Sequence, residues 1–126
     1  MLTLAPMAEK KKIAELFNEK GISLSEFSGC VTAKNGDEVL GLCLYELTDK
    51  KITVQYIEPL NDIPLADGIL RSTLHVAAER SVMNAFYADT VPEQFFEKLN
   101  FIKEREEKSL NIDKLFESCC SCSGGK

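Results

Sequence analysis

Residues 51–101 decide the fold, and they read KITVQYIEPLNDIPLADGILRSTLHVAAERSVMNAFYADTVPEQFFEKLNF. The stretch begins with an apolar strand pattern at 51–58, continues with a helical pattern at 65–80, and returns to a short apolar strand at 84–89. A second helix begins at Pro92. Strands that share one sheet and are joined through a helix are normally parallel. We therefore predict a crossover that places the two strands side by side and parallel.

The residues before this stretch predict an antiparallel hairpin. Strand patterns at 28–33 and 38–47 are joined by KNGD, in which Asn35-Gly36 favours the positive backbone angles of a tight turn. A turn centred there places Cys30 opposite Gly41. Both alternating sets of the second strand are apolar, so we expect both faces of the sheet to be covered.

The remaining patterns complete a mixed α/β sheet. Residues 1–5 predict an edge strand, residues 7–20 an amphipathic helix, and residues 101–112 a last, charged strand that runs antiparallel to its neighbour. The predicted fold is one domain over residues 1–114. Its sheet is an antiparallel meander followed by a central parallel pair, with helices on both faces. Alternation places three residues of the first parallel strand on one face: Ile52, Val54 and Tyr56.

Composition limits the classes of function. The 126 residues fit a single domain, and a formal net charge of -5 argues against nucleic acid or an anionic membrane as the main partner. No segment approaches the roughly 20 apolar residues that span a bilayer, and the first residues lack the order of a signal peptide. We expect a cytoplasmic protein with reduced cysteines.

One short motif points to a family. The sequence FFEKLNF at residues 95–101 resembles the FYEKLGF motif of the GNAT acetyltransferase superfamily, and the element order over residues 28–111 resembles that fold. The resemblance implies a GNAT-like fold and transfer of an acetyl group from acetyl-CoA to an amine. It also implies that the acyl donor lies between the two parallel strands, beside the main chain of Gln55, Tyr56 and Ile57.

The resemblance further implies a site for the diphosphate of CoA. Aligning residues 65–70 with the family's Gln/Arg-x-x-Gly-x-Gly/Ala loop assigns the diphosphate contacts to Gly68 and Ile69, with Arg71 close behind. The alignment also shows departures, because leucines replace the polar residue and the second glycine. Asp67 adds a negative charge at the loop.

The catalytic groups implied by the resemblance are an acid and a base. Phe96 stands where family members often carry the tyrosine that protonates the leaving thiolate, so Tyr87 or Tyr56 would have to supply that proton. Glu58, or Glu46 on the neighbouring strand, is placed to activate the amine. Packed aromatic rings and solvated carboxylates are the alternative interpretation of these residues. We assign catalysis to Glu58 and Tyr87.

The cysteines form two groups. Cys30 and Cys43 lie in strands, on one face by the predicted register, and we interpret them as small core residues. Cys119, Cys120 and Cys122 fall within residues 115–126, a small, polar and glycine-rich tail. Three thiols this close could bind a soft ion such as zinc, copper(I) or arsenic, or form a reversible disulfide. A structural zinc site would need a fourth ligand.

Three hypotheses about function follow. The first is an acyl-CoA-dependent N-acetyltransferase that acts on a small-molecule or peptide amine and uses acetyl-CoA. The second is a non-catalytic protein that uses the same cleft for binding. The third is a metal or redox protein that acts through the cysteine tail. A homodimer is compatible with each of them.

Overall fold

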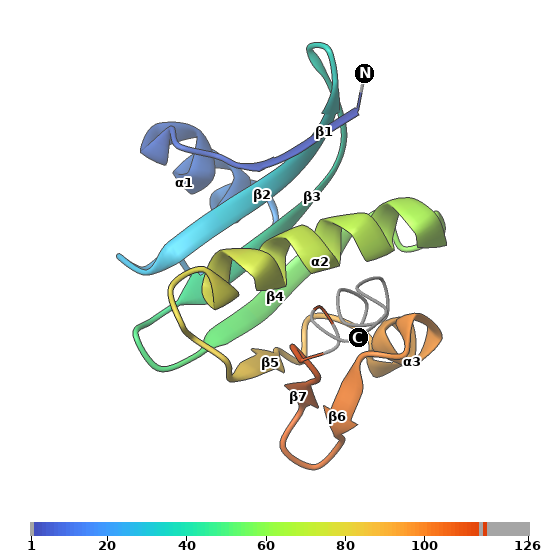
Figure 1. Ribbon diagram of the computed structural model, residues 1–126. Helices are drawn as coiled ribbons and strands as arrows, with labels where there is room; N and C mark the ends of the chain where they lie inside the picture. Colours follow the sequence, from blue (N-terminus) through green and yellow to red (C-terminus); the bar gives the residue numbers. More distant parts are fainter. Residues whose placement is uncertain (1, 114, 116–126) are drawn as a thin grey trace.

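A computed structural model describes residues 2–113 and residue 115. The described chain forms a seven-stranded sheet in the order β1-β2-β3-β4-β5-β7-β6, with three helices packed on it (Figure 1). The strands are β1 (Leu2–Pro6), β2 (Ser28–Asn35), β3 (Glu38–Leu47), β4 (Ile52–Glu58), β5 (Ala85–Tyr87), β6 (Ile102–Glu104) and β7 (Ser109–Leu110). The helices are α1 (Lys10–Glu19), α2 (Ile63–Ala78) and α3 (Glu93–Leu99).

The predicted crossover is confirmed. β4 and β5 pair in parallel, and α2 connects them across one face of the sheet (Figure 1). All other neighbouring strands are antiparallel, which gives the mixed α/β sheet expected from the sequence. The parallel ladder is short, because it runs only from the pair Ile52–Ala85 to the pair Val54–Tyr87.

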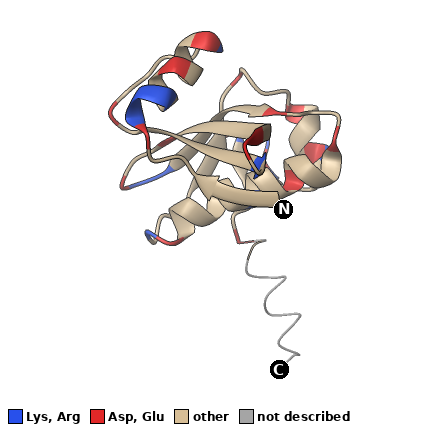
Figure 2. Ribbon diagram, turned by 90° about the horizontal axis from the view of Figure 1, so that it is seen from above, with Lys and Arg blue, Asp and Glu red and all other residues tan. Residues whose placement is uncertain are grey.

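Two apolar clusters cover the two faces of the sheet. The larger lies on the side of α2 and α3 and contains Cys43, Ile69 and Phe96. The smaller lies on the side of α1, where Phe17 packs against Leu44. The strands carry few charged residues, and most acidic and basic residues lie on helices and turns (Figure 2). Both faces of β3 are covered as predicted from Gly41 onward, whereas Glu38, Val39 and Leu40 at its start are exposed.

The register of the β2–β3 hairpin differs from the prediction. Asn35 pairs with Glu38, so the turn residues are Gly36 and Asp37, and a bulge follows between Ala33 and Lys34. Together these shifts pair Cys30 with Leu44 instead of Gly41, three positions further along β3. An odd shift moves a side chain to the other face. Cys30 and Cys43 are both fully buried as expected, but they lie in different clusters.

A second bulge interrupts β4. Leu44 pairs with Tyr56 while Tyr45 pairs with Val54, which leaves Gln55 as the extra residue. The expected common face of Ile52, Val54 and Tyr56 is therefore wrong, because a bulge reverses the alternation that follows it. Val54 packs in the larger cluster, whereas Tyr56 packs against the smaller one, beside α1.

The end of the domain is a hairpin instead of the single strand predicted for residues 101–112. β7 lies between β5 and β6, and it is antiparallel to both. The chain reverses at Arg105–Lys108, where Lys108 adopts a left-handed backbone conformation with φ 56°. At the end of α3, Asn100 adopts a left-handed backbone conformation with φ 64°, which asparagine tolerates well. Of the predicted tail, the structure describes Leu115, which packs against the larger cluster.

Candidate active-site cleft between two parallel strands

A cleft opens where the β4–β5 ladder ends. Beyond Val54, β4 continues to Glu58 paired only with β3 in the described structure. The chain after β5 stays close for a few residues, because Ala88 donates its amide hydrogen to the Val54 carbonyl (2.9 Å) and the Thr90 hydroxyl donates to the Gln55 carbonyl. It then diverges around a cavity of about 300 Å³. The lining residues are Tyr56, Ile57, Glu58, Pro59, Leu60, Asn61, Thr90, Val91 and Pro92.

Three polar side chains meet at one wall of this cleft. The Tyr56 hydroxyl donates to Glu58 Oε1 at 2.5 Å, and the ammonium of Lys20 lies 3.1 Å from the same oxygen. Lys20 also lies over the ring of Tyr56, 5.2 Å from its centroid. The Tyr56 hydrogen bond, helped by Lys20, holds the pKa of Glu58 below its ordinary value. The same contacts raise the pKa of Tyr56 and that of Lys20.

Each member of this cluster is held by a local feature of the chain. The bulge at Gln55 turns Tyr56 toward α1, and Glu58 follows two residues later on the same strand. Lys20 is the C-cap residue of α1. Sequence analysis missed Lys20, since a lysine at the end of an amphipathic helix gives no sign of its partner on β4.

Gly41 allows the cleft wall to approach β3 closely. A β-carbon at this position would lie 2.6 Å from the Glu58 carbonyl oxygen and 2.8 Å from Pro59 Cδ. Contacts this short do not occur between real atoms of these types, so glycine is required for the observed packing. The glycine thereby fixes the position of Glu58.

The structure does not bring Glu58 and Tyr87 together. Tyr87 is buried in the larger cluster, where its ring lies 4.6 Å from that of Phe96. Its hydroxyl donates to Glu93 Oε1 at 3.3 Å, and burial and this carboxylate raise its pKa. Tyr87 does not line the cleft. Tyr56 is therefore the tyrosine that lies beside Glu58.

The alternative base, Glu46, has a different neighbour. It lies on β3 opposite Thr53, and its carboxylate accepts a hydrogen bond from the Ser25 hydroxyl at 2.8 Å. Glu46 is absent from the lining of the cleft. Glu58 is thus the better placed of the two carboxylates.

The segment aligned with a phosphate loop is helical. Asp62 caps α2 by accepting a hydrogen bond from the Leu65 amide (3.3 Å), and its own carbonyl accepts from the Ala66 amide (2.9 Å). Pro64 occupies the first turn. An aspartate cap and an early proline are common helix starts, and α2 begins at Ile63, two residues before the helical pattern predicted over 65–80. Gly68 therefore lies inside α2.

The three residues expected at the diphosphate have other neighbours. Gly68 faces β1, since a β-carbon there would lie 3.4 Å from Leu4 Cδ1. Ile69 is fully buried in the core. Arg71 pairs with Asp67 at 2.8 Å and lies over the ring of Phe101. None of the three lines the cleft, whereas Tyr56 and Ile57 do.

Gln55 borders the cleft through its main chain. Its carbonyl accepts the Thr90 hydroxyl hydrogen bond that joins the two diverging segments. Its side-chain Oε1 is buried and has no hydrogen-bond partner among the described residues. The bulge therefore places a polar side chain in an interior position beside the cleft.

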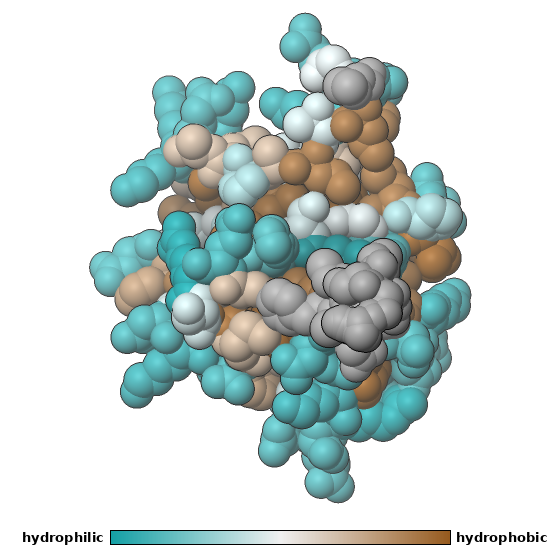
Figure 3. Space-filling view, viewed as in Figure 1, coloured by the Kyte–Doolittle hydropathy of each residue, from teal (hydrophilic) through white to brown (hydrophobic). Residues whose placement is uncertain are grey.

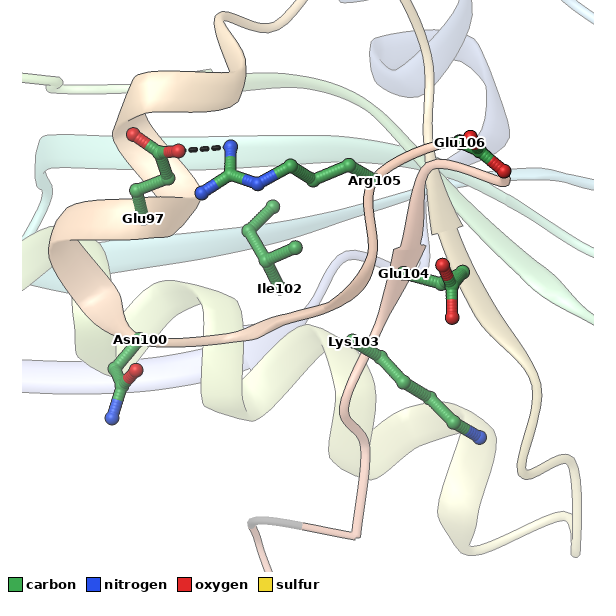
Figure 4. Close-up of a pocket in the computed structure, with 7 residues that line it drawn as sticks. All are labelled: Glu97, Asn100, Ile102, Lys103, Glu104, Arg105 and Glu106. Atoms are coloured by element: carbon green, nitrogen blue, oxygen red, sulfur yellow. Dashed lines mark ion pairs between the residues drawn. The ribbon is translucent and has the colours of Figure 1, made fainter.

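A wider surface hollow, of about 620 Å³, lies at the end of α3 and the start of the last hairpin (Figure 4). Arg105 reaches across it and forms ion pairs with Glu93 and Glu97. These two carboxylates neutralise Arg105, which is the only arginine among the described residues that line the hollow. None of the residues predicted from sequence for catalysis or donor binding lines this hollow.

Several solved structures named as acetyltransferases have a similar fold. A GNAT-family acetyltransferase from Streptococcus pneumoniae superposes with a TM-score of 0.55 at 17% identity, covering 81% of this chain and 88% of that one. The fold is that of the GNAT acetyltransferases. A predicted acetyltransferase from Clostridium acetobutylicum, solved with acetyl-CoA, gives a TM-score of 0.57 at 16% identity over 90% of this chain and 98% of that one.

A third solved structure with the GNAT-like fold is the KacTA–DNA complex, with a TM-score of 0.64 at 11% identity over 96% of this chain and 99% of that one. Neither a family model nor a curated protein matches the sequence. Within residues 2–113 and 115, no helix is long and apolar enough to cross a membrane.

The predicted metal ligands Cys119, Cys120 and Cys122 lie outside the described residues. Within the described part, no cluster of three or more histidine, cysteine or acidic side chains could hold a metal ion. A role for the three cysteines therefore remains a prediction from the sequence.

Proposed function

We propose that the protein is an N-acyltransferase that moves an acyl group from a thioester to a small-molecule or peptide amine in the β4–β5 cleft. The observation that carries this proposal is the one-sided stretch of β4, from Gln55 to Glu58, which lines a cavity with a carboxylate on its wall. The GNAT-like fold supports the reaction class. Function still rests on the site, because one fold can host many activities.

The cleft suits the acyl-carrying end of a thioester donor. Ile57, Leu60 and Val91 give it apolar walls, and the main chain of β4 lacks a strand partner on the cleft side in the described structure. A thioester arm that contains amide groups could pair with that main chain while its carbon chain contacts the apolar walls. Such positioning is a large source of rate acceleration.

Acetyl-CoA is the donor that the fold implies, and its two ends fit this chain differently. The pantetheine arm fits the size and apolar lining of the cleft. The diphosphate does not fit the start of α2, where the Asp62 carboxylate already caps the helix and Pro64 has no amide hydrogen. The proposed reaction therefore involves only the thioester, the amine and the residues at the cleft.

Glu58 is proposed to receive the proton of the amine. Because its pKa is lowered, it is ionised at neutral pH and can attract an ammonium group. The amine nitrogen forms a bond to the acyl carbon as the carbon–sulfur bond breaks, and the proton lost by nitrogen passes to Glu58 or to water. A lowered pKa makes Glu58 a weak base, so its main contribution is to hold the amine.

Tyr56 is proposed to supply the proton that the leaving thiolate takes up. Its hydroxyl is at the cleft, whereas that of Tyr87 is held by Glu93 in the larger cluster. Lys20 balances the charge of Glu58 and fixes its orientation. We expect the reaction to take place in the cytoplasm, where cysteine thiols stay reduced.

The alternative is a non-catalytic protein that binds a ligand in the same cleft. Phe96 motivates it, because this buried ring has no proton to donate at the position where GNAT-like sequences often carry a tyrosine. Both proposals predict binding, and only the first predicts chemistry.

Acetyl transfer to a panel of amines, measured with S-acetylpantetheine and with acetyl-CoA, tests the proposal. Glu58→Gln should lower the rate by about 100-fold, because it removes the charge that holds the amine and an acceptor for its proton. Glu46→Gln is the matched control, since this carboxylate lies on the neighbouring strand outside the cleft. Absence of transfer with retained binding would support the non-catalytic alternative, and absence of donor binding at millimolar concentration would exclude the acyltransferase.

A further inference from the structure

We infer that the cleft recognises its donor through an uncharged pantetheine-like arm alone and gains nothing from a nucleotide diphosphate. The inference rests on the proposed function and specifies its donor class. That class is an acyl thioester on a neutral amide-containing arm. It goes against the expectation set by the GNAT-like fold, for which acetyl-CoA is the implied donor.

The start of α2 follows directly after the lining of the cleft in the sequence. The lining of the cleft includes Asn61, and the next residue is Asp62, the helix cap. A free helix start attracts anions through its unpaired amide hydrogens and its dipole. Here the Asp62 carboxylate accepts the Leu65 amide hydrogen, and Pro64 has none to offer. The position that a phosphate would take is held by the chain's own carboxylate.

The surface next to the start of α2 is largely apolar. A second cavity, of about 430 Å³, is lined by Asp62 together with Leu2, Asn35, Leu40, Pro64 and Leu65. Leu2 and Leu40 are exposed, and an apolar surface runs from the first strand to the start of α2 (Figure 3). A charged group leaving the cleft past Asn61 would meet leucines and one carboxylate.

The described lysines and arginines near these cavities do not offset the Asp62 carboxylate. Neither the cleft nor the second cavity has a lysine or arginine among its described lining residues. Arg71, the basic residue expected to compensate, is engaged by Asp67 and lies over Phe101. Lys20 is paired with Glu58 and is absent from the lining of both cavities. The negative charges of a diphosphate would therefore meet a like charge without a described cationic partner.

The test compares three donors by titration calorimetry on the full-length protein: S-acetylpantetheine, S-acetylphosphopantetheine and acetyl-CoA. They share one arm and carry increasing negative charge. We expect dissociation constants that stay level or rise along this series, by up to about 10-fold for acetyl-CoA. Because salt screens repulsion as well as attraction, raising the salt concentration should strengthen acetyl-CoA binding relative to S-acetylpantetheine.

Asp62→Asn isolates the charge. Asparagine caps helices as well as aspartate does, so the variant should fold normally. We expect it to bind acetyl-CoA several-fold more tightly and S-acetylpantetheine with unchanged affinity. Asp49→Asn is the matched control, because Asp49 lies in the turn before β4, at the end of the strand away from the cleft.

The outcomes separate this inference from the proposed function. Acetyl-CoA binding measurably tighter than S-acetylpantetheine, or an acetyl-CoA affinity that does not increase in Asp62→Asn, overturns the inference and leaves the proposed function standing. Failure of all three donors to bind at millimolar concentration overturns both. Preference for S-acetylphosphopantetheine over the other two would indicate an arm carried on a protein and would also contradict the inference.

Discussion

The ammonium of Lys20 lies 3.1 Å from the carboxylate of Glu58, and this contact joins the end of α1 to the cleft end of β4. The Tyr56 hydroxyl shares the same carboxylate oxygen. A cation and a hydrogen-bond donor therefore act on one acid. The proton affinity of Glu58 depends on a helix that is remote from β4 in the sequence.

This cluster predicts how the pKa of Glu58 responds to substitution. The Tyr56 hydrogen bond is the largest single cause of the lowered pKa, and Lys20 adds a hydrogen bond and its positive charge, so Tyr56→Phe and Lys20→Met should each raise the pKa of Glu58. Carboxyl carbon NMR titration measures both shifts. An unchanged pKa in either variant would contradict the assignment.

The same lowered pKa predicts a stability difference with a defined pH dependence. A group whose pKa is lower in the folded than in the unfolded state stabilises the fold above its unfolded value and loses this effect as pH falls. The stability that wild type gains over Tyr56→Phe should therefore be complete at pH 7 and shrink as pH falls below the ordinary value of 4.5. Urea unfolding at several pH values tests this, and a difference that grows at low pH would oppose it.

Two glycine-to-alanine substitutions should have opposite effects. Gly41→Ala places a β-carbon against the Glu58 carbonyl and Ile69, and such overpacking costs about 1–3 kcal/mol. Gly68→Ala lies in α2 with only an ordinary contact to Leu4, and helix propensity favours it by up to about 1 kcal/mol. Denaturant unfolding compares the two. The prediction fails if Gly41→Ala is neutral.

Restoring a tyrosine on α3 should not restore a catalytic acid. Phe96 is fully buried against Tyr87 and Phe95, so Phe96→Tyr would add a hydroxyl inside an apolar cluster. Such a group costs about 1–3 kcal/mol when it lacks a partner. We expect a lower melting temperature and no faster acyl transfer. A faster rate with unchanged stability would show that the hydroxyl reaches the cleft.

Cys30 and Cys43 should resist alkylation in the folded protein. Burial raises the pKa of each thiol to about 12, so at pH 8 roughly one in ten thousand is ionised. Mass spectrometry after brief iodoacetamide treatment at pH 8, with a denatured sample as control, measures this directly. Rapid native labelling of either residue would contradict their burial.

The cysteine tail makes its own prediction. If Cys119, Cys120 and Cys122 bind a soft metal, full-length protein should take up zinc or arsenite with a stoichiometry that a chain ending at Phe116 lacks. Equal uptake by the two chains would rule out a role for the tail.

Local patterns predicted most of the fold and less of the site. The helices, the parallel crossover and the left-handed Asn100 follow from periodicity and backbone preference, which act over a few residues. The bulge at Gln55 does not follow from local patterns, because it depends on how the two covered faces of the sheet pack. Both sequence neighbours of Gln55 are apolar, so the alternation of residues gives no sign of the bulge. Strict alternation along the strand therefore predicted the wrong face of the sheet for Tyr56.

Contacts between distant segments account for the rest of the discrepancy. The pairing of Lys20 with Glu58 joins two charged residues that each look solvated on their own element. The start of α2 was predicted within two residues from helical periodicity, and the Asp62 cap sets its observed position.

The stretch of β4 left unpaired beyond Val54 also bears on association with other chains through that edge. An unpaired strand edge normally lies at the rim of a sheet, where a strand from another molecule can add to it. The edge of β4 beyond Gln55 lies instead in the middle of the sheet, and the segment carrying Thr90, Val91 and Pro92 faces it across a cavity of about 300 Å³. The protein thus offers a main-chain edge to a narrow ligand while shielding it from a whole strand.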